Sequence, residues 1–441
     1  MFGQVWLLQL LALTKRPSAM SRILIQNGRI IDPSQQLDRV TSLSIANGRI
    51  AGYDASVDGH DQVIDAQGKI VAPGLIDLAV QLREPGREED ETIQTGTVAA
   101  VAGGYTSIVC LPNTEPPIDT QAGVEFVRQK AARARNCNVF VAGCVSNDRA
   151  GKELAEIGSL VEAGAVAFTD APSPIQSSEL LRRAFEYCLM FDKPILSHPE
   201  ALELSHDGIM HEGTVSMVLG LAGMPTEAED VMTSRDLRLA EATGGRLHLL
   251  NLSSASSIDL LRRVKARGVA VTAGVCPPNF VLTDERLRSF DSRYKLNPPL
   301  RSQEHVDACI AGLADGTIDV ISSGHAPRAL EKKMLELDRA PFGAVGLETT
   351  LSLVITQLIQ PGHLDWSAAL EKLTINPARV LGIDKGTLRI GADADVAIID
   401  PDASWTVDSS CFRSKSSNTP FDGWELKGRV VQVIVGGELR S

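Results

Sequence analysis

The sequence predicts an α/β protein in which a (β/α)8 TIM barrel carries a small flanking β-rich domain built from both chain ends. Three observations support this. The middle of the chain alternates short apolar runs with amphipathic segments, and both ends contain alternating apolar runs broken by turn signals. At 441 residues, the chain is too long for one ordinary domain unless that domain is a large barrel. The chemistry of such a barrel lies at the C-terminal ends of its strands.

The first twenty residues differ from the rest of the chain. Their apolar run is too short to span a bilayer, no basic residue precedes it, and Lys15-Arg16 follow it. Met20 directly precedes a well-formed strand pattern, Arg22–Gln26. We therefore expect residues 1–20 to be a dispensable or mis-started extension, with a targeting segment as the alternative.

The β-rich domain is predicted from residues 22–72 and 385–441. The first segment contains two Asn-Gly pairs, Asn27-Gly28 and Asn47-Gly48, between alternating apolar runs, and such pairs are strong hairpin signals. Similar alternating apolar runs occur near the other end, in G-T-L-R-I-G-A-D-A-D-V-A-I-I-D-P and R-V-V-Q-V-I-V-G-G-E-L. We expect both ends to join one small composite domain.

The barrel is predicted over residues 73–384, without a low-complexity tract or a flexible linker. Amphipathic helical patterns lie between its strands, for example at Glu91–Ala102, Glu179–Phe191, Glu229–Ala242 and Ser256–Arg267. The expected strands are Leu75–Leu82, Thr106–Leu111, Val139–Val145, Ala165–Thr169, Pro194–His198, Arg246–Leu252, Ala270–Val275 and Asp319–Ser323.

Composition excludes several classes of partner. The net charge of −12 argues against a nucleic acid or an anionic membrane, and no stretch after residue 20 is long enough to cross a bilayer. The seven cysteines are scattered, with no C-x-x-C pair, so we expect reduced, buried thiols in a cytoplasmic protein.

A series of ordered motifs then becomes specific. P-G-L-I-D, L-R-E-P-G, L-P-N-T-E-P-P, S-H-P-E, N-P-P-L-R, G-H-A-P and A-P-F-G-A-V-G-L-E-T occur in this order. From about residue 22 to the C-terminus, the chain resembles dihydroorotase of the amidohydrolase superfamily. The resemblance implies one or two zinc ions at the barrel mouth. Their ligands would be H-x-H on strand one, an acidic residue after strand four, histidines ending strands five and six, and an aspartate ending strand eight.

The sequence departs from this implied ligand set. Asp170 and His198 match two ligand positions, which is fewer than the three protein ligands of a catalytic zinc. A rebuilt mononuclear site from Asp170, His198 and His325 is an alternative. The lost positions lie on three different strands, so no single register shift restores them: Ala79, Gln81, Asn251 and Gly324, the last also replacing the catalytic proton-shuttling aspartate.

Positions that the resemblance assigns to the substrate are retained. Arg83 and Asn113 match residues that grip a carboxylate, and Asn297 matches one that contacts the pyrimidine ring. The alternatives are an ion pair of Arg83 with Glu84 or another loop carboxylate, and a turn-stabilising role for Asn113.

Two exchanges accompany these retained positions. Pro278-Asn279 replace a usual histidine pair, and Arg328 replaces the histidine that ends the strand-eight motif. A buried Asp170 without a metal needs a partner, so we expect Arg328 to reach into the pocket and neutralise it.

These departures predict a catalytically inactive homologue with no cofactor, which persists as a structural subunit. It resembles the non-catalytic dihydroorotase-like chains that associate with aspartate carbamoyltransferase in pyrimidine biosynthesis, so we expect an oligomer with that partner. One alternative is an active, zinc-dependent cyclic amidohydrolase that converts dihydroorotate and water to carbamoyl aspartate. Another is a regulatory subunit that binds a pyrimidine precursor through Arg83, Asn113 and Asn297.

Overall fold

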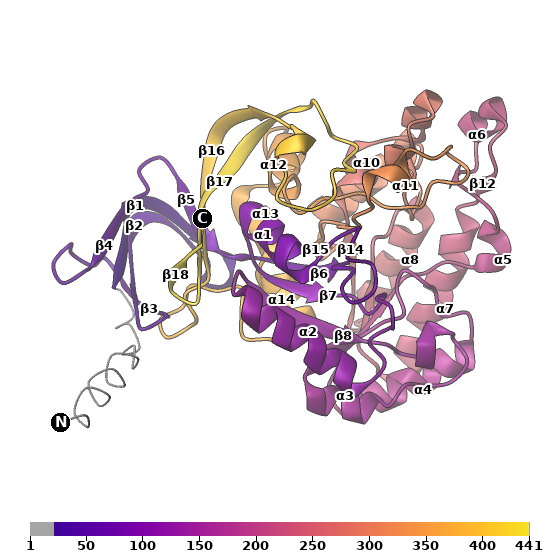
Figure 1. Cartoon of the computed structure of the whole chain (residues 1–441), viewed down its shortest axis with the longest axis horizontal. Coiled ribbons are helices and arrows are strands. Elements are labelled where there is room, and N and C mark those ends of the chain that lie inside the picture. The colour runs from indigo at the N-terminus through magenta and orange to yellow at the C-terminus, as the bar shows by residue number, and fades with distance from the viewer. Residues whose placement is uncertain (1–21, 441) are drawn as a thin grey trace, which may run out of the picture.

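The structure is a computed structural model that describes residues 22–440, and the expectation about residues 1–20 lies outside this range. Two eight-stranded sheets dominate it: one forms the barrel and the other forms the flanking β domain (Figure 1). Strands from the two ends of the chain lie side by side in the flanking domain, and helices surround the barrel (Figure 1).

The barrel contains all eight strands expected from the sequence, and the (β/α)8 prediction is confirmed. Neighbouring strands pair in parallel in the order β15-β14-β13-β10-β9-β8-β7-β6. Each strand is close to its predicted place: β7 keeps its predicted length but is shifted by one residue, and the other seven strands are shorter than predicted. The bounds are β6 Leu75–Val80, β7 Tyr105–Cys110, β8 Asn138–Gly143, β9 Ala165–Phe168, β10 Ile195–Ser197, β13 Leu247–Leu249, β14 Val271–Val275 and β15 Val320–Ile321.

Hydrogen bonds connect the first and last strands of the barrel at the mouth. The carboxylate of Asp77 on β6 accepts from the backbone N–H of Ser323, just after β15, at 2.9 Å. The N–H of Gln81 donates to the carbonyl of His325 at 3.1 Å. The mouth segments that follow β6 and β15 are therefore held against each other.

The flanking sheet corrects one prediction. Asn47-Gly48 forms the turn between β2 and β3, as expected, but Asn27-Gly28 lies inside β1. There the β1–β2 register shifts between Ile25 and Gly28, so this pair forms a bulge, with Asn27 at φ 62°. The strands are β1 Ile23–Asp32, β2 Leu37–Ala46, β3 Arg49–Tyr53, β4 Gln62–Asp65, β5 Ile70–Pro73, β16 Val396–Thr406, β17 Glu425–Val435 and β18 Glu438–Leu439.

The helices cover the barrel and form its mouth. In α1, Thr92 caps the first turn by accepting from the N–H of Thr95.

No helix among residues 22–440 is long and apolar enough to cross a membrane. The bounds are α1 Ile93–Ala102, α2 Gln121–Ala134, α3 Ile157–Ala163, α4 Ser178–Leu189, α5 Leu202–Ser205, α6 Thr214–Leu219, α7 Glu227–Thr243, α8 Ala255–Ala266, α9 Pro277–Val281, α10 Gln303–Ala314, α11 Leu330–Lys333, α12 Thr350–Val354, α13 Trp366–Leu373 and α14 Ile375–Leu381.

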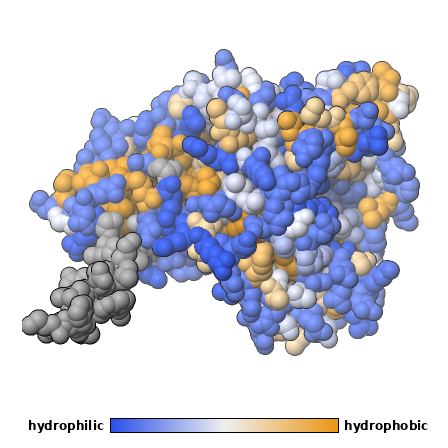
Figure 2. All heavy atoms as spheres, viewed as in Figure 1, coloured by the Kyte–Doolittle hydropathy of each residue, from blue (hydrophilic) through white to orange (hydrophobic). Residues whose placement is uncertain are grey.

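Helix α6 lies at the upper right edge of the molecule near β12 (Gly223–Met224), which pairs with β11 (Met210–His211) (Figure 1). It carries two strongly exposed apolar side chains, Met217 at 81% and Val218 at 64%. The space-filling view shows hydrophobic surface at this upper right end of the molecule (Figure 2).

Candidate functional site

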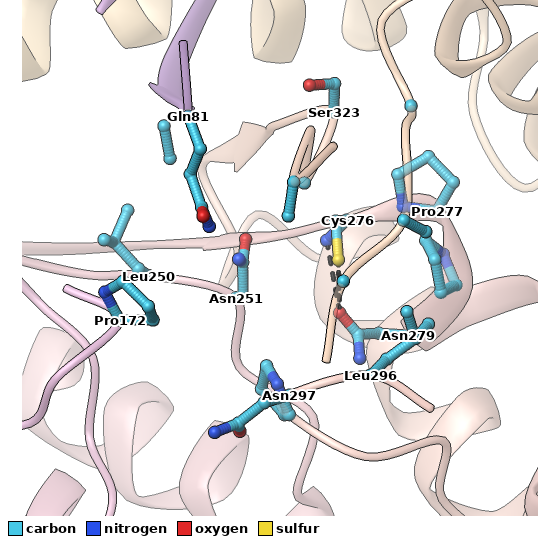
Figure 3. A pocket seen from close by; sticks show the side chains of 18 of the residues that line it. Gln81, Pro172, Leu250, Asn251, Cys276, Pro277, Asn279, Leu296, Asn297 and Ser323 are labelled. Atoms are coloured by element: carbon cyan, nitrogen blue, oxygen red, sulfur yellow. Dashed lines mark hydrogen bonds between the residues drawn. The ribbon is translucent and has the colours of Figure 1, made fainter. Parts of the chain in front are cut away.

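A cavity opens where the barrel strands end, which is the part of this fold that carries chemistry. It contains about 790 Å³ of atom-free space, part of it continuous with solvent. Gln81 extends into it after β6, and Asn251 follows β13 (Figure 3). His198, directly after β10, also lines it.

The cavity contains the positions at which the resemblance implies metal ligands. Ala79, Gln81, Asn251 and Gly324 all line it. Ala79 has only a methyl group, Gln81 and Asn251 have neutral amides, and Gly324 has no side chain. Zinc prefers imidazole, thiolate and carboxylate ligands. Among residues 22–440, no cluster of three or more His, Cys, Asp and Glu side chains could hold a metal ion. The residues present do not fit a zinc centre.

Asp170 does not act as a surviving ligand in this geometry, which corrects its assignment from the sequence. Its carboxylate accepts from the N–H groups of Val145 at 2.9 Å and Ser146 at 3.1 Å, and from the Ser146 hydroxyl. Burial raises its pKa, while these hydrogen bonds oppose the rise. Successive side chains of an extended segment point to opposite sides, and Ala171 is the residue that lines the cavity.

His198 lines the cavity as expected, but the protein itself engages the ring. Its Nε2 atom lies 3.1 Å from Oε2 of Glu200. Glu200 also accepts from the Ser205 hydroxyl at 2.5 Å and from the Asn297 amide at 2.9 Å. Burial raises the pKa of Glu200, but these partners, His198 foremost, lower it to about 2. The carboxylate therefore stays ionised.

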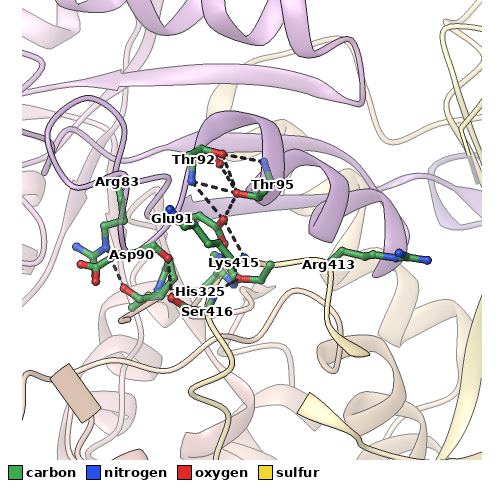
Figure 4. Close-up of polar contacts among 12 residues, drawn as sticks. Arg83, Asp90, Glu91, Thr92, Thr95, His325, Arg413, Lys415 and Ser416 are labelled. Atoms are coloured by element: carbon green, nitrogen blue, oxygen red, sulfur yellow. Dashed lines mark hydrogen bonds and ion pairs between the residues drawn. The ribbon is translucent and has the colours of Figure 1, made fainter. Parts of the chain in front are cut away.

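His325, which belongs to the alternative mononuclear site, is not brought to the cavity, and neither is the barrel histidine His248. His325 is buried, with Nε2 3.5 Å from Oε2 of Glu91 at the start of α1 (Figure 4). His248 lies inside the barrel, where its Nδ1 contacts the Thr272 hydroxyl at 2.9 Å and burial lowers its pKa to about 3. The alternative mononuclear site from Asp170, His198 and His325 is therefore not assembled.

Arg328 does not fill the pocket or neutralise Asp170, so this prediction was wrong. Its Nε donates to the Phe342 carbonyl at 2.9 Å, and its Nη1 lies 3.7 Å from Oδ2 of Asp90. Asp90 is fully buried and also binds Lys332 at 2.9 Å. Arg328 therefore lies near the buried carboxylate of Asp90 in the mouth loops. Asp170 does not need this cation, because hydrogen bonds already satisfy its carboxylate.

Arg83 does not line the cavity either. It is 1% exposed, and its Nε donates to the Pro327 carbonyl at 3.2 Å. Burial, together with the positive charge of Arg328, lowers its pKa to about 9. The alternative ion pair with Glu84 is also wrong, because Glu84 pairs with Lys130 at 2.7 Å.

The two retained asparagines have different places. Asn113 donates to Oε1 of Gln81 at 2.9 Å and does not itself line the cavity, whereas Asn297 lines it.

Sequence reasoning missed the role of Glu200, although its spacing of two residues from His198 in S-H-P-E was a usable signal. It also missed Cys276, which lines the cavity and whose thiol donates to Asn279 Oδ1 at 2.9 Å.

Comparison of the sequence with known proteins gives a consistent family. A model of the Dihydro-orotase-like family matches residues 68–257, and one described as Amidohydrolase family matches residues 341–440. A protein named "Putative dihydroorotase" from Rhodopirellula baltica is 49% identical over 94% of this chain and 92% of its own. One named "Dihydroorotase" from Pelotomaculum thermopropionicum is 50% identical over 95% of this chain and 98% of its own.

Solved structures with the same architecture extend this similarity. The L-hydantoinase (dihydropyrimidinase) from Arthrobacter aurescens superimposes with a TM-score of 0.85 at 25% identity, covering 95% of this chain and 96% of that one. The dihydropyrimidinase from Brevibacillus agri gives a TM-score of 0.82 at 22% identity, covering 95% and 94%. At that identity the second likeness concerns the fold alone.

Proposed function

The chain belongs to the dihydroorotase family of amidohydrolases, and from this premise we propose that it has lost metal-dependent hydrolysis and serves pyrimidine biosynthesis as a structural subunit. One observation carries the proposal. Of the six ligand positions that the resemblance implies, with Ala171 rather than Asp170 facing the cavity, only the one at His198 carries a coordinating side chain there. A catalytic zinc normally has three protein ligands, and it supplies a nucleophilic hydroxide near neutral pH.

Neither the Cys276 thiol in the cavity nor Glu200, which contacts His198 from outside the cavity lining, offers a metal-free replacement. Burial raises the pKa of the Cys276 thiol to about 12, so it remains protonated and weakly nucleophilic. Glu200, with a pKa of about 2, is too weak a base to remove a proton from water efficiently at neutral pH. Gly324 lies where the proton-shuttling aspartate would stand.

A role in assembly is supported because the chain retains the barrel of the family but lacks the residues of its metal centre. The proposed partner is aspartate carbamoyltransferase, by resemblance to the non-catalytic dihydroorotase-like subunits. The exposed Met217 and Val218 on α6 are a candidate contact, because exposed apolar groups can mark interaction surfaces. Co-expression with the organism's carbamoyltransferase tests this by size exclusion. We expect co-elution that Met217→Lys weakens, and separate elution with unchanged transferase activity contradicts the proposal.

The comparisons favour a second candidate, an active dihydroorotase. Relatives that are 50% and 46% identical over 95% of this chain carry that name. This candidate requires a metal that the cavity holds through a rearranged ligand set. The assay is the hydrolysis of dihydroorotate to carbamoyl aspartate by protein supplied with zinc. Turnover that is lost on chelation and restored by zinc supports the second candidate and contradicts the first.

A further inference from the structure

A second hollow lies outside the barrel mouth, between the start of α6, the short helix η3 (Asp284–Ser289) and the start of α10. Figure 1 shows α6 at the upper right edge of the molecule. The hollow contains about 820 Å³ of atom-free space, part of it continuous with solvent. It shares no lining residue with the cavity at the barrel mouth, so a ligand here would occupy a separate site.

The buried carboxylate of Asp284 lines this hollow without a cationic partner. Asp284 is 5% exposed, and neither of its oxygens is among the enclosed, unpartnered atoms of the described chain, so both keep accessible surface. Burial raises the pKa of Asp284, and the charge of Glu285 raises it further. Arg288, whose charge opposes this rise, forms its ion pair with Glu285. Asp284 has therefore lost hydration without gaining the partner that a buried carboxylate normally has.

The hollow is negatively charged at neutral pH. Its ionisable lining residues are Asp284, Glu285 and His211, and no lysine or arginine of the described chain lines it. Burial and the charge of Arg301 lower the pKa of His211 to about 4, so the ring is neutral. No group of three or more His, Cys, Asp and Glu side chains within residues 22–440 could hold a metal ion. An organic cation is therefore the ligand that fits this charge.

His211 supplies a hydrogen-bond donor on the wall of the same hollow. The Nη1 atom of Arg301 lies 3.3 Å from Nδ1 of His211. A guanidinium group only donates, so Nδ1 accepts and, in the neutral ring, Nε2 carries the proton. Arg301 is held in turn by the Ser253 hydroxyl at 3.0 Å and the Met224 carbonyl at 3.2 Å. These contacts fix the ring, and no described residue accepts a hydrogen bond from its Nε2–H group.

We propose that this hollow binds a guanidinium or alkylammonium group on a ligand that also carries a carbonyl or hydroxyl acceptor. Asp284 binds the cation, Glu285 adds negative charge at the rim, and the Nε2–H group of His211 donates to the acceptor. An arginine or lysine side chain of another protein has this chemistry, and so does a small free amine. The inference goes beyond the proposed function and does not depend on it, because it holds with or without zinc at the barrel mouth.

Isothermal titration of the full chain tests the ligand class. Nα-acetylargininamide represents a side chain within a polypeptide, β-alaninamide represents a small free amine, and Nα-acetylcitrullinamide is the uncharged counterpart of the first. We expect millimolar or tighter binding of at least one cation, and binding of the citrulline compound at least about tenfold weaker than that of the arginine compound. The tighter of the two cations identifies the source of the ligand. No heat from either cation at millimolar concentration overturns the inference, as does equal binding of the citrulline compound.

Asp284→Asn tests the central contact, because it removes the charge and retains the shape of the side chain. We expect Nα-acetylargininamide to bind at least about tenfold more weakly. Asp58→Asn makes the same charge change at an exposed position of the flanking domain and should leave binding unchanged. Glu285→Gln at the exposed rim should weaken binding about two- to fivefold, which tests the site without altering its buried wall.

His211→Asn tests the donor, because asparagine retains an oxygen acceptor for Arg301 but has no group at the place of Nε2. We expect weaker binding of Nα-acetylargininamide and unchanged binding of methylguanidinium, which has no acceptor for the Nε2–H group. Equal losses for the two ligands contradict the role of His211. Unaltered binding in both the Asp284 and the Glu285 variants overturns the site.

Discussion

The Nε2 atom of His198 lies 3.1 Å from Oε2 of Glu200, a carboxylate that sits two residues further along the same strand end. The resemblance to dihydroorotase implies a metal ligand at the position of this histidine. Here Glu200 engages one ring nitrogen and is itself held by Ser205 and Asn297. The contact ties the remaining coordinating side chain into a hydrogen-bonded network of the protein.

Substitution of Glu200 should flatten the acid limb of the stability curve. Its pKa falls from 4.5 to about 2 on folding, so ionisation of Glu200 stabilises the fold above the unfolded pKa. This contribution is lost as the pH falls from about 4.5 towards 2 and corresponds to about 3 kcal/mol. Glu200→Gln should remove that part of the pH dependence in denaturant titrations. An unchanged curve means that the His198–Glu200 contact does not form.

Asp170 should behave as a structural residue. Asp170→Asn places an amide NH₂ group against the donors of Val145 and Ser146, and we expect a loss of about 2–4 kcal/mol in the free energy of unfolding. Metal content should stay at its starting value. A variant of normal stability that has lost a bound metal contradicts this assignment and restores Asp170 as a ligand.

Gly324 should be hard to replace. Its φ is 65°, and a Cβ atom there would lie 3.0 Å from the Cβ of Cys276. Gly324→Ala combines backbone strain with this contact, so we expect a loss of about 2–3 kcal/mol. The matched control is Gly391→Ala, at φ 87° with no atom within 4 Å, for which we expect about 1 kcal/mol. Equal losses in thermal unfolding would show that the contact has no cost.

Replacing ligands should restore a metal centre. A chain that combines Ala79→His, Gln81→His, Ala171→Asp and Asn251→His with the native His198 has five coordinating side chains around one cavity. We expect about one zinc ion per chain by elemental analysis after dialysis, since three or four ligands suffice. Gln129→His on the exposed face of α2 is the control, with no gain expected. Failure to bind zinc means that the mouth lost more than its ligands.

Much of the fold could be predicted because local pattern and packing agree. The apolar runs from Leu75 to Ser323 all became barrel strands, since each is too short for a helix and is flanked by amphipathic segments. The Asn27-Gly28 pair gave a wrong prediction of a hairpin turn, because the same local backbone conformation occurs in turns and in β-bulges. Pairing of β1 with β2 continues on both sides of this pair, and that pairing depends on tertiary packing rather than on the local sequence.

At the site, positions could be predicted but orientations could not. Ala79, Gln81, Asn251 and Gly324 line the cavity because motif spacing fixes where strands end. Asp170 and Ala171 are neighbours in sequence, and only the hydrogen bonds from Val145 and Ser146 decide which of them faces inward. The partner of Arg328 depended on a buried carboxylate at position 90, from a loop more than two hundred residues earlier in the chain.

The decisive measurement is the zinc content of protein purified without added metal, taken together with dihydroorotate hydrolysis on the same sample. We predict well under ~0.1 zinc per chain and no hydrolysis above the uncatalysed rate, because His198 alone cannot retain the ion. Zinc at about one or two per chain, with hydrolysis that follows its removal and return, would contradict the loss of the metal centre.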